Sequence, residues 1–108
     1  MSDEVPFQTV AKVGDIALGQ GMSYTVNGRM VAVFNDQGEY FAIDDFCPHM
    51  GASLAGGYLE KGVVSCPWHA WRFCVTDGRW CDNPKLKVDA FALRIEGDEI
   101  QVQVPPKK

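Results

Sequence analysis

Two short segments of this chain combine residue types that bind transition metals. The first is Cys47-Pro48-His49, and the second, after residues 50–65, is Cys66-Pro67-Trp68-His69. Each segment offers one thiolate and one imidazole, which are common ligands of zinc and iron. The chain has only two histidines, and both lie in this pattern, each close to a cysteine. The spacing therefore predicts a metal centre whose four ligands are Cys47, His49, Cys66 and His69.

The arrangement of the ligands favours iron over zinc. Structural zinc sites also use two thiolates and two imidazoles, but they often place both cysteines in one loop and both histidines in the other. Here each loop mixes one cysteine with one histidine. That mixture suits a two-iron centre in which one iron takes the thiolates and the other takes the imidazoles. A structural zinc site and a cluster-free interaction module are the alternatives.

The elements that position these loops are expected to be β-strands. Alternating apolar and polar residues, or short apolar runs, predict strands at 22–26, 29–34, 40–43, 91–95 and 100–104. Asn27-Gly28, residues 35–38 and Gly97-Asp98 predict the turns between them. No stretch of about 12 residues has helical periodicity. Because these strands come from both ends of the chain, we expect an all-β scaffold with a loop-rich insert at about residues 45–84.

Length and composition limit the possible functions. A chain of 108 residues predicts a single domain over 1–108. The formal net charge of −4 argues against nucleic acid or an anionic membrane surface as a partner, because both require a basic face. The N-terminal residues have no signal-peptide pattern, and no apolar run approaches the roughly 20 residues of a membrane helix. We therefore expect a cytoplasmic protein that is not anchored in a membrane.

The two ligand segments resemble the cluster loops of the Rieske iron–sulfur family, and look most like those of its soluble ferredoxins. The resemblance extends to Trp71-Arg72-Phe73, Thr76-Asp77-Gly78 and Pro84. It implies an antiparallel β-sandwich with a cluster-binding subdomain at one tip. It also implies a [2Fe–2S] cluster whose inner iron is bound by the two cysteines and whose outer, more exposed iron is bound by the two histidines.

The resemblance implies an electron carrier without catalytic activity of its own. No histidine is left for the mononuclear iron of a terminal oxygenase, and no G-x-G-x-x-G motif is present for a nicotinamide or flavin. We expect single electrons to pass from a reductase to a terminal oxidoreductase such as a ring-hydroxylating oxygenase. The alternative is the small subunit of an assimilatory NAD(P)H nitrite reductase, whose large subunit would then be the partner.

Residues beside the ligands differ from those of the high-potential respiratory members of the family. Those members have an additional cysteine in each cluster loop, where this chain has Ala52 and Trp68. They also have a serine after the second loop, where this chain has Ala70 and Trp71. Fewer hydrogen bonds to the cluster sulfurs stabilise the reduced state less. We expect a potential at the low end of the Rieske range of about −150 to +300 mV.

Cys74 and Cys81 are not needed as ligands. A two-residue turn at Asp77-Gly78 would place these cysteines opposite each other across a hairpin, where a disulfide is possible. A three-residue turn ending at Gly78 would pair Cys74 with Trp80 and turn Cys81 to the other face. In a reducing cytoplasm we expect two thiols.

Other residues near the loops allow two interpretations. The aromatic residues either shield the cluster and shape a docking face or belong to the core; they are Trp68, Trp71 and Phe73. The acidic residues either guide docking or, as the preferred interpretation, form a solvated face; they are Asp44, Asp45 and Glu60.

Overall fold

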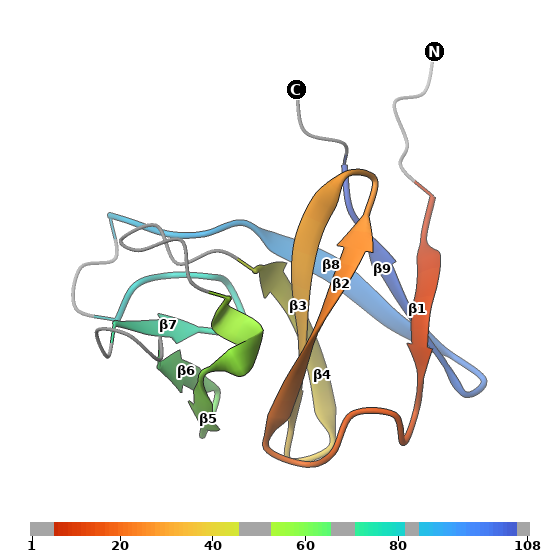
Figure 1. The fold of residues 1–108 in the computed structure, drawn as a ribbon, viewed down its shortest axis with the longest axis horizontal. Helices are drawn as coiled ribbons and strands as arrows, with labels where there is room; N and C mark the ends of the chain where they lie inside the picture. Colours follow the sequence, from red (N-terminus) through yellow and green to blue (C-terminus); the bar gives the residue numbers. More distant parts are fainter. Residues whose placement is uncertain (1–5, 46–52, 66–70, 82–84, 106–108) are drawn as a thin grey trace.

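Two antiparallel β-sheets form the framework of the protein (Figure 1). The computed structural model describes residues 6–45, 53–65, 71–81 and 85–105. The larger sheet has six strands in the order β1-β9-β8-β4-β3-β2, and the smaller has three in the order β5-β6-β7. The strands are β1 (Gln8–Lys12), β2 (Gln20–Val26), β3 (Arg29–Asp36), β4 (Glu39–Asp44), β5 (Tyr58–Glu60), β6 (Val63–Ser65), β7 (Arg72–Cys74), β8 (Ala90–Glu96) and β9 (Glu99–Gln103), and a 3-10 turn, η1, covers Leu54–Gly56. The all-β, antiparallel prediction is confirmed.

Tight hairpins build the six-stranded sheet. Asn27 and Gly28 have φ angles of 52° and 78°, so both adopt the left-handed conformation of a two-residue turn that matches the twist of the strands. This turn makes Val26 the partner of Arg29. The predicted turns after β3 and after β8 also join paired strands. The predictions of these three hairpins are therefore confirmed.

One face of the larger sheet encloses an apolar cluster that we call the scaffold core. Its buried residues are Ala11, Ile16, Val26, Val31, Val33, Ala42, Ile100, Val102 and Val104. Ile100, Val102 and Val104 are fully buried, which confirms that the alternating pattern at the end of the chain marks a strand with one buried face.

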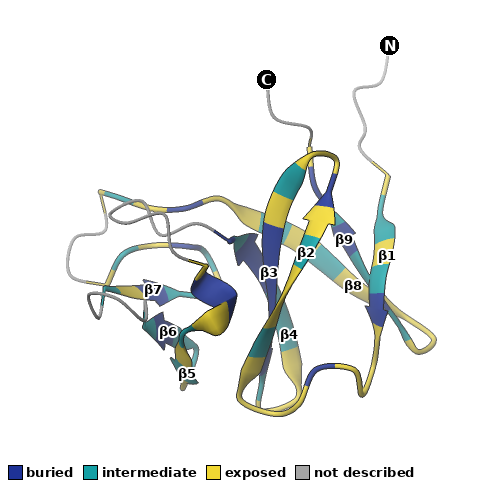
Figure 2. Ribbon diagram, viewed as in Figure 1, coloured by how far each residue is buried: buried dark blue, intermediate teal, exposed yellow. Residues whose placement is uncertain are grey.

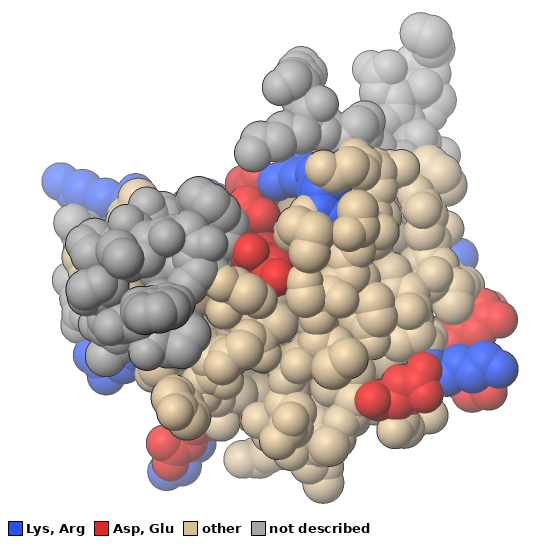
Figure 3. All heavy atoms as spheres, viewed as in Figure 1, with Lys and Arg blue, Asp and Glu red and all other residues tan. Residues whose placement is uncertain are grey.

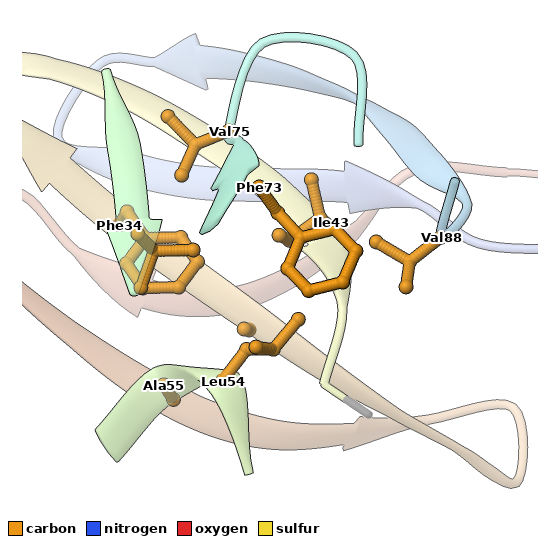
Figure 4. Packing of buried hydrophobic residues seen from close by; sticks show 9 residues of the cluster. Phe34, Ile43, Leu54, Ala55, Phe73, Val75 and Val88 are labelled. Atoms are coloured by element: carbon orange, nitrogen blue, oxygen red, sulfur yellow. The ribbon is translucent and has the colours of Figure 1, made fainter. Parts of the chain in front are cut away.

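A second apolar cluster, the insert core, lies between the two sheets (Figure 4). It contains Ala32, Phe34, Ile43, Leu54, Ala55, Val64, Phe73, Val75 and Val88. Strand β3 contributes to both cores, because successive side chains of a strand point to opposite faces. Val31 and Val33 therefore enter the scaffold core, and Ala32 and Phe34 enter the insert core. Figure 2 shows β3 and η1 as buried elements where the two sheets meet.

Phe34 requires a glycine on the neighbouring strand. Gly21 of β2 is its direct cross-strand partner. A Cβ atom at Gly21 would lie 2.6 Å from two carbon atoms of the Phe34 ring, which is far inside van der Waals contact. The absence of a side chain at Gly21 therefore lets the ring lie against the backbone of β2.

The sequence did not predict four of the strands, namely β1, β5, β6 and β7. The last three have three residues each, which is too short for an alternating pattern to be recognised. They divide the insert into a small sheet and its connecting segments, so the insert is more regular than predicted. Within the described ranges, no helix has the length and hydropathy needed to cross a membrane.

Candidate metal centre

The four predicted ligands lie outside the residues that the structure describes. Cys47 and His49 belong to residues 46–52, which we call the first ligand segment, and Cys66 and His69 belong to residues 66–70, the second ligand segment. Ala52, Trp68, Ala70 and Pro84 also lie outside the described residues. The residues at the ends of both segments are described, and they show how the fold presents them.

A buried carboxylate holds the two ends of the first ligand segment together. Asp45, the last described residue before the segment, is 6% exposed. Its Oδ1 and Oδ2 atoms accept hydrogen bonds from the Ser53 hydroxyl at 2.8 and 2.9 Å. Ser53 is the first described residue after the segment. The segment is therefore closed at its base by a side-chain hydrogen bond, and Cys47 lies two residues beyond it.

The same carboxylate also links the loop base to its surroundings. Asp45 Oδ2 accepts a 2.6 Å hydrogen bond from the Ser23 hydroxyl on β2, and Oδ1 accepts a 2.8 Å hydrogen bond from the backbone N–H of Ala55 in η1. A buried carboxylate needs such donors to offset the loss of its hydration. Asp45 thus joins a scaffold strand to the insert.

This position corrects the interpretation of Asp45 as a solvated or docking residue. Its carboxylate is buried and accepts hydrogen bonds from both sides of the loop. Asp44 is partly exposed and lies 3.7 Å from the Arg29 guanidinium, while Glu60 is exposed on β5. A run of acidic residues in a sequence does not reveal which of them turns inward.

Strand pairing holds the ends of the second ligand segment together. Ser65, the last residue of β6, is the cross-strand partner of Arg72, the first residue of β7. The segment with Cys66 and His69 therefore connects two neighbouring strands, and its ends are held side by side by the ladder.

The described ends of both ligand segments meet on the insert core. Leu54, which follows the first segment, packs in the same buried cluster as Val64 and Phe73, which flank the second (Figure 4). The backbones also approach closely, since a Cβ at Gly57 would lie 2.1 Å from the Ser65 carbonyl oxygen. Only glycine fits at position 57. The fold therefore anchors both cysteine- and histidine-bearing segments to one small hydrophobic platform.

Aromatic side chains that follow the second ligand segment in the sequence extend this platform. Phe73 is fully buried, so its interpretation as a core residue is confirmed. Trp71 is partly buried against the insert core, and its ring stacks on Trp80 with centroids 4.1 Å apart and an interplanar angle of 14°.

Trp80 is a residue that the sequence analysis did not select for the site. Its Nε1–H is buried and has no hydrogen-bond partner among the residues that the structure describes. Leaving a buried N–H unpaired costs about 1–3 kcal/mol. This buried donor lies on a ring that stacks against Trp71, the residue that follows the second ligand segment, so an acceptor near the two rings would satisfy it. No sequence pattern around Trp80 indicates this position.

The hairpin with Cys74 and Cys81 has neither of the two predicted registers. Phe73 pairs with Trp80, the Cys74 N–H donates to the Arg79 carbonyl at 2.8 Å, and the Cys81 N–H donates to the Arg72 carbonyl at 2.7 Å. Cys74 is therefore opposite Arg79, not opposite Cys81 or Trp80. The cause is a four-residue turn over 75–78, closed by a 2.7 Å hydrogen bond from the Gly78 N–H to the Cys74 carbonyl.

The two cysteines nevertheless lie next to each other as thiols. Their Sγ atoms are 3.6 Å apart and are not joined by a disulfide. They share a face because Cys81 is diagonal to Cys74 across the ladder. The structure contains both residues as thiols, the state expected in a reducing cytoplasm.

A charged turn lies at the tip of this hairpin. The Asp77 carboxylate accepts hydrogen bonds from the Arg79 backbone N–H at 3.0 Å and from Arg79 Nε at 2.7 Å. The backbone N–H, followed by the guanidinium, lowers the pKa of Asp77 below its ordinary value of 3.8. Across the described ranges, no three histidine, cysteine or acidic side chains are grouped so that they could hold a metal ion.

Comparison with known proteins gives one matching family. The model of the Rieske [2Fe-2S] domain matches residues 6–102. The biphenyl dioxygenase ferredoxin subunit of Pseudomonas sp. (strain KKS102) is 35% identical over 98 residues, which cover 89% of this chain and 90% of that protein.

Two solved structures are similar over nearly their full length. The ferredoxin of carbazole 1,9a-dioxygenase from Nocardioides aromaticivorans IC177 has a TM-score of 0.85 and 30% identity, covering 94% of this chain and 98% of that one. A putative NADH-dependent nitrite reductase small subunit from Mycobacterium tuberculosis has a TM-score of 0.86 and 25% identity, covering 94% and 97%.

Proposed function

This chain belongs to the Rieske [2Fe-2S] family, and on that premise we propose that Cys47, His49, Cys66 and His69 hold the cluster with which it carries single electrons to a ring-hydroxylating oxygenase. The two cysteines supply thiolates to one iron, and the two histidines supply imidazoles to the other. This donor set fits a Rieske cluster, and it uses every histidine in the chain.

One observation carries the assignment of the ligands. The described ends of both ligand segments are held over the insert core, one by the Asp45–Ser53 hydrogen bond and the other by the pairing of β6 with β7. The residues at the ends of the two segments therefore lie close together on the insert core. The buried, unpaired Nε1–H of Trp80 lies beside the same platform and supports an acceptor there.

The protein residues provide a rigid and partly dry site. When bound, the cluster supplies reversible one-electron chemistry at a potential raised by its two neutral imidazole ligands. The insert core under the segments, with Phe73 and Leu54 fully buried, excludes water from the protein side. The Asp45 carboxylate and the pairing of β6 with β7 restrain the described ends of both ligand segments.

An oxygenase is the preferred partner. The biphenyl dioxygenase ferredoxin subunit and the carbazole dioxygenase ferredoxin both belong to dioxygenase systems. Both are more similar to this chain in sequence than the nitrite reductase small subunit is. The nitrite reductase small subunit remains the second candidate, because its fold is equally close. The described residues on the face seen in Figure 3 are mostly uncharged, with acidic and basic side chains in small groups, so this face does not favour either partner.

The low potential and the cytoplasmic location are further parts of the proposal. High-potential members have two disulfide-bonded cysteines where this chain has Ala52 and Trp68. They have a serine where this chain has Ala70 and Trp71. These differences support a reduction potential at the low end of the Rieske range. In a reducing cytoplasm, Cys74 and Cys81 would remain the thiols that the structure contains. A voltammetric midpoint in the upper half of the range would contradict the first point.

Electron paramagnetic resonance of the dithionite-reduced protein tests the ligand set. We expect the low average g value of a cluster with imidazole ligands, and its loss in Cys66→Ser and His69→Ala. Cys74→Ser and Cys81→Ser are matched controls and should keep the signal, since they change cysteines outside the proposed set. An unchanged spectrum in His69→Ala, or loss of the signal in Cys74→Ser, would contradict the assignment.

Electron delivery tests the partner. The reduced protein is mixed anaerobically with a terminal ring-hydroxylating oxygenase or with the large subunit of an assimilatory nitrite reductase, and reoxidation is followed by its visible spectrum. We expect fast reoxidation by the oxygenase only. Fast reoxidation by the reductase alone would favour the second candidate.

A further inference from the structure

The paired cysteines of the β7 hairpin are left over once the cluster ligands are assigned. Cys74 Sγ and Cys81 Sγ lie 3.6 Å apart on one face of the hairpin. We propose that Cys74 and Cys81 form a redox-active dithiol, which a low-molecular-weight disulfide such as oxidised glutathione converts to an intramolecular disulfide. This site requires neither the cluster nor its partner, so it stands independently of the function proposed above.

The sulfur atoms, 3.6 Å apart, are close enough to bond after a small movement. A disulfide requires the two sulfurs to approach to about 2.0 Å, so they must close a gap by rotation of side chains that already point to the same side. The hairpin ladder fixes both backbones, because the Cys74 and Cys81 N–H groups each donate to a carbonyl of the opposite strand. Neither cysteine needs to leave its strand.

The turn between the cysteines is itself held in place from several sides. Val88 N–H donates to the Gly78 carbonyl at 2.9 Å, and a Cβ at Gly78 would lie 2.1 Å from the Val88 carbonyl oxygen. Phe73 is anchored in the insert core, and Trp80 stacks on Trp71. Most of the chain entropy that closing this ring would cost has therefore been lost on folding. The second thiol is held close to the first at a high effective concentration.

The different exposure of the two thiols sets the order of reaction. Cys81 is exposed and Cys74 is half-buried. Cys81 also borders a shallow depression of about 350 Å³, together with Lys61 and Arg72 among other residues. A tripeptide disulfide can reach Cys81 from this side, whereas Cys74 is less accessible. Cys81 is therefore the attacking thiol, and Cys74 is the resolving thiol.

The exchange balances with oxidised glutathione as the two-electron oxidant. The Cys81 thiolate attacks one sulfur of the glutathione disulfide, which forms a mixed disulfide and releases one glutathione thiolate. The Cys74 sulfur then attacks Cys81 Sγ and expels the second glutathione. The two thiol protons pass to the two glutathione thiolates, so the products are one protein disulfide and two molecules of reduced glutathione. A reduced dithiol reverses both steps.

Peptide mapping of the intact, cluster-containing protein tests the proposal. The protein is equilibrated anaerobically in buffers with increasing ratios of oxidised to reduced glutathione, quenched with acid, alkylated and digested with trypsin. Cleavage after Lys61, Arg72, Arg79 and Lys85 separates Cys74 in peptide 73–79 from Cys81 in peptide 80–85, and both from Cys66 in peptide 62–72. We expect linked peptides 73–79 and 80–85 to accumulate as the ratio rises, and to disappear when dithiothreitol is added.

Two matched variants test the order of the steps. Cys74→Ser should accumulate a glutathione adduct on peptide 80–85, because the resolving thiol is missing. Cys81→Ser should react with glutathione at Cys74 more slowly than Cys74→Ser reacts at Cys81, by about tenfold or more, because access controls the rate.

Three results would overturn the proposal. The first is the absence of linked peptides even in fully oxidised glutathione. The second is glutathione on peptide 62–72 in preference to peptide 80–85. The third is equal reaction rates in the two serine variants. The proposed cluster is tested separately by its spectrum, so a failure of one hypothesis does not resemble a failure of the other.

Discussion

The two cores of this protein are built in different ways, although both use β3. The scaffold core is enclosed by strands of five to eight residues from one sheet and by segments that adjoin it. The insert core joins two sheets, and its smaller sheet has strands of only three residues each. Short ladders supply few hydrogen bonds, so the insert depends on buried contacts such as Phe73 and on the Asp45 carboxylate.

The difference indicates that the larger sheet supplies most of the stability, whereas the insert supports the ligand segments. A long antiparallel sheet can form from its own hairpins and apolar pattern. The small sheet and the two ligand segments need the larger sheet beneath them, because Ala32, Phe34 and Ile43 supply one side of the insert core. We therefore expect changes in the insert core to release the cluster before the scaffold unfolds. Changes in the scaffold core should affect both regions together.

The largest effect is expected from truncation of a central side chain in each core. Phe73→Ala and Ile100→Ala remove fully buried side chains, which costs about 3–5 and 2–5 kcal/mol respectively. In Phe73→Ala, the visible absorption of the cluster should be lost at a lower denaturant concentration than the far-ultraviolet circular dichroism of the sheet. In Ile100→Ala, the two transitions should coincide. Coincident transitions in both variants would remove the distinction between the cores.

Removal of the Asp45 carboxylate should be the next largest effect. Asp45→Ala leaves the backbone N–H of Ala55 without its acceptor, and a buried unpaired donor costs about 1–3 kcal/mol. We also expect faster iron release to a chelator, since the first ligand segment loses the bond that closes its base. Glu60→Ala removes an exposed carboxylate from the same region and should release iron at the wild-type rate. Equal rates in the two variants would show that Asp45 does not restrain the loop.

Two adjacent glycines offer a comparison within the insert. A Cβ at Gly57 would lie 2.1 Å from the Ser65 carbonyl oxygen, whereas a Cβ at Gly56 would meet nothing within 4 Å. Gly57→Ala must push β5 away from β6, which costs about 1–3 kcal/mol. Gly56→Ala should leave the thermal midpoint close to that of the wild type. If the two variants melt at the same temperature, the close approach is not needed to hold the ligand segments together.

The smallest effect should come from the exposed turn at Asp77. Hydrogen bonding from Arg79 lowers the pKa of Asp77 below 3.8, so the folded state binds this proton less tightly than the unfolded state. The resulting stability is present above the ordinary pKa, and it is lost as the pH falls through 3.8 towards the lower folded value. Between about pH 5 and pH 3, urea midpoints should fall slightly less for Asp77→Asn than for the wild type. Parallel pH profiles would contradict this expectation.

The scaffold was predictable because its signals are local. Asn27-Gly28 fixes a turn type by backbone conformation, and the alternation at residues 100–104 reveals one buried face. The short strands of the insert carry no such period. The ligand positions were selected by residue type and spacing, which describe chemistry and do not describe how the loops are supported.

The errors arose where tertiary contacts decide the outcome. Asp45 resembles its acidic neighbours in the sequence, but three donors draw it inward, one each from β2, Ser53 and η1. The register of Cys74 and Cys81 depends on a four-residue turn that the Val88 backbone helps to hold. Neither the donors nor Val88 can be identified from the residues next to the turn or the carboxylate.

The Gly21–Phe34 pair has a consequence for how the chain avoids misfolding. Both faces of β3 are apolar, so a slip of one residue against its neighbours would expose no polar group to the interior and would meet little penalty from hydropathy. The slip would, however, move the benzyl group of Phe34 to the scaffold side, away from the notch that Gly21 leaves for it. The volume of the Phe34 side chain therefore selects one register of β3 against β2. The described ends of the ligand segments therefore depend on the steric fit of Gly21 and Phe34, neither of which is a proposed ligand.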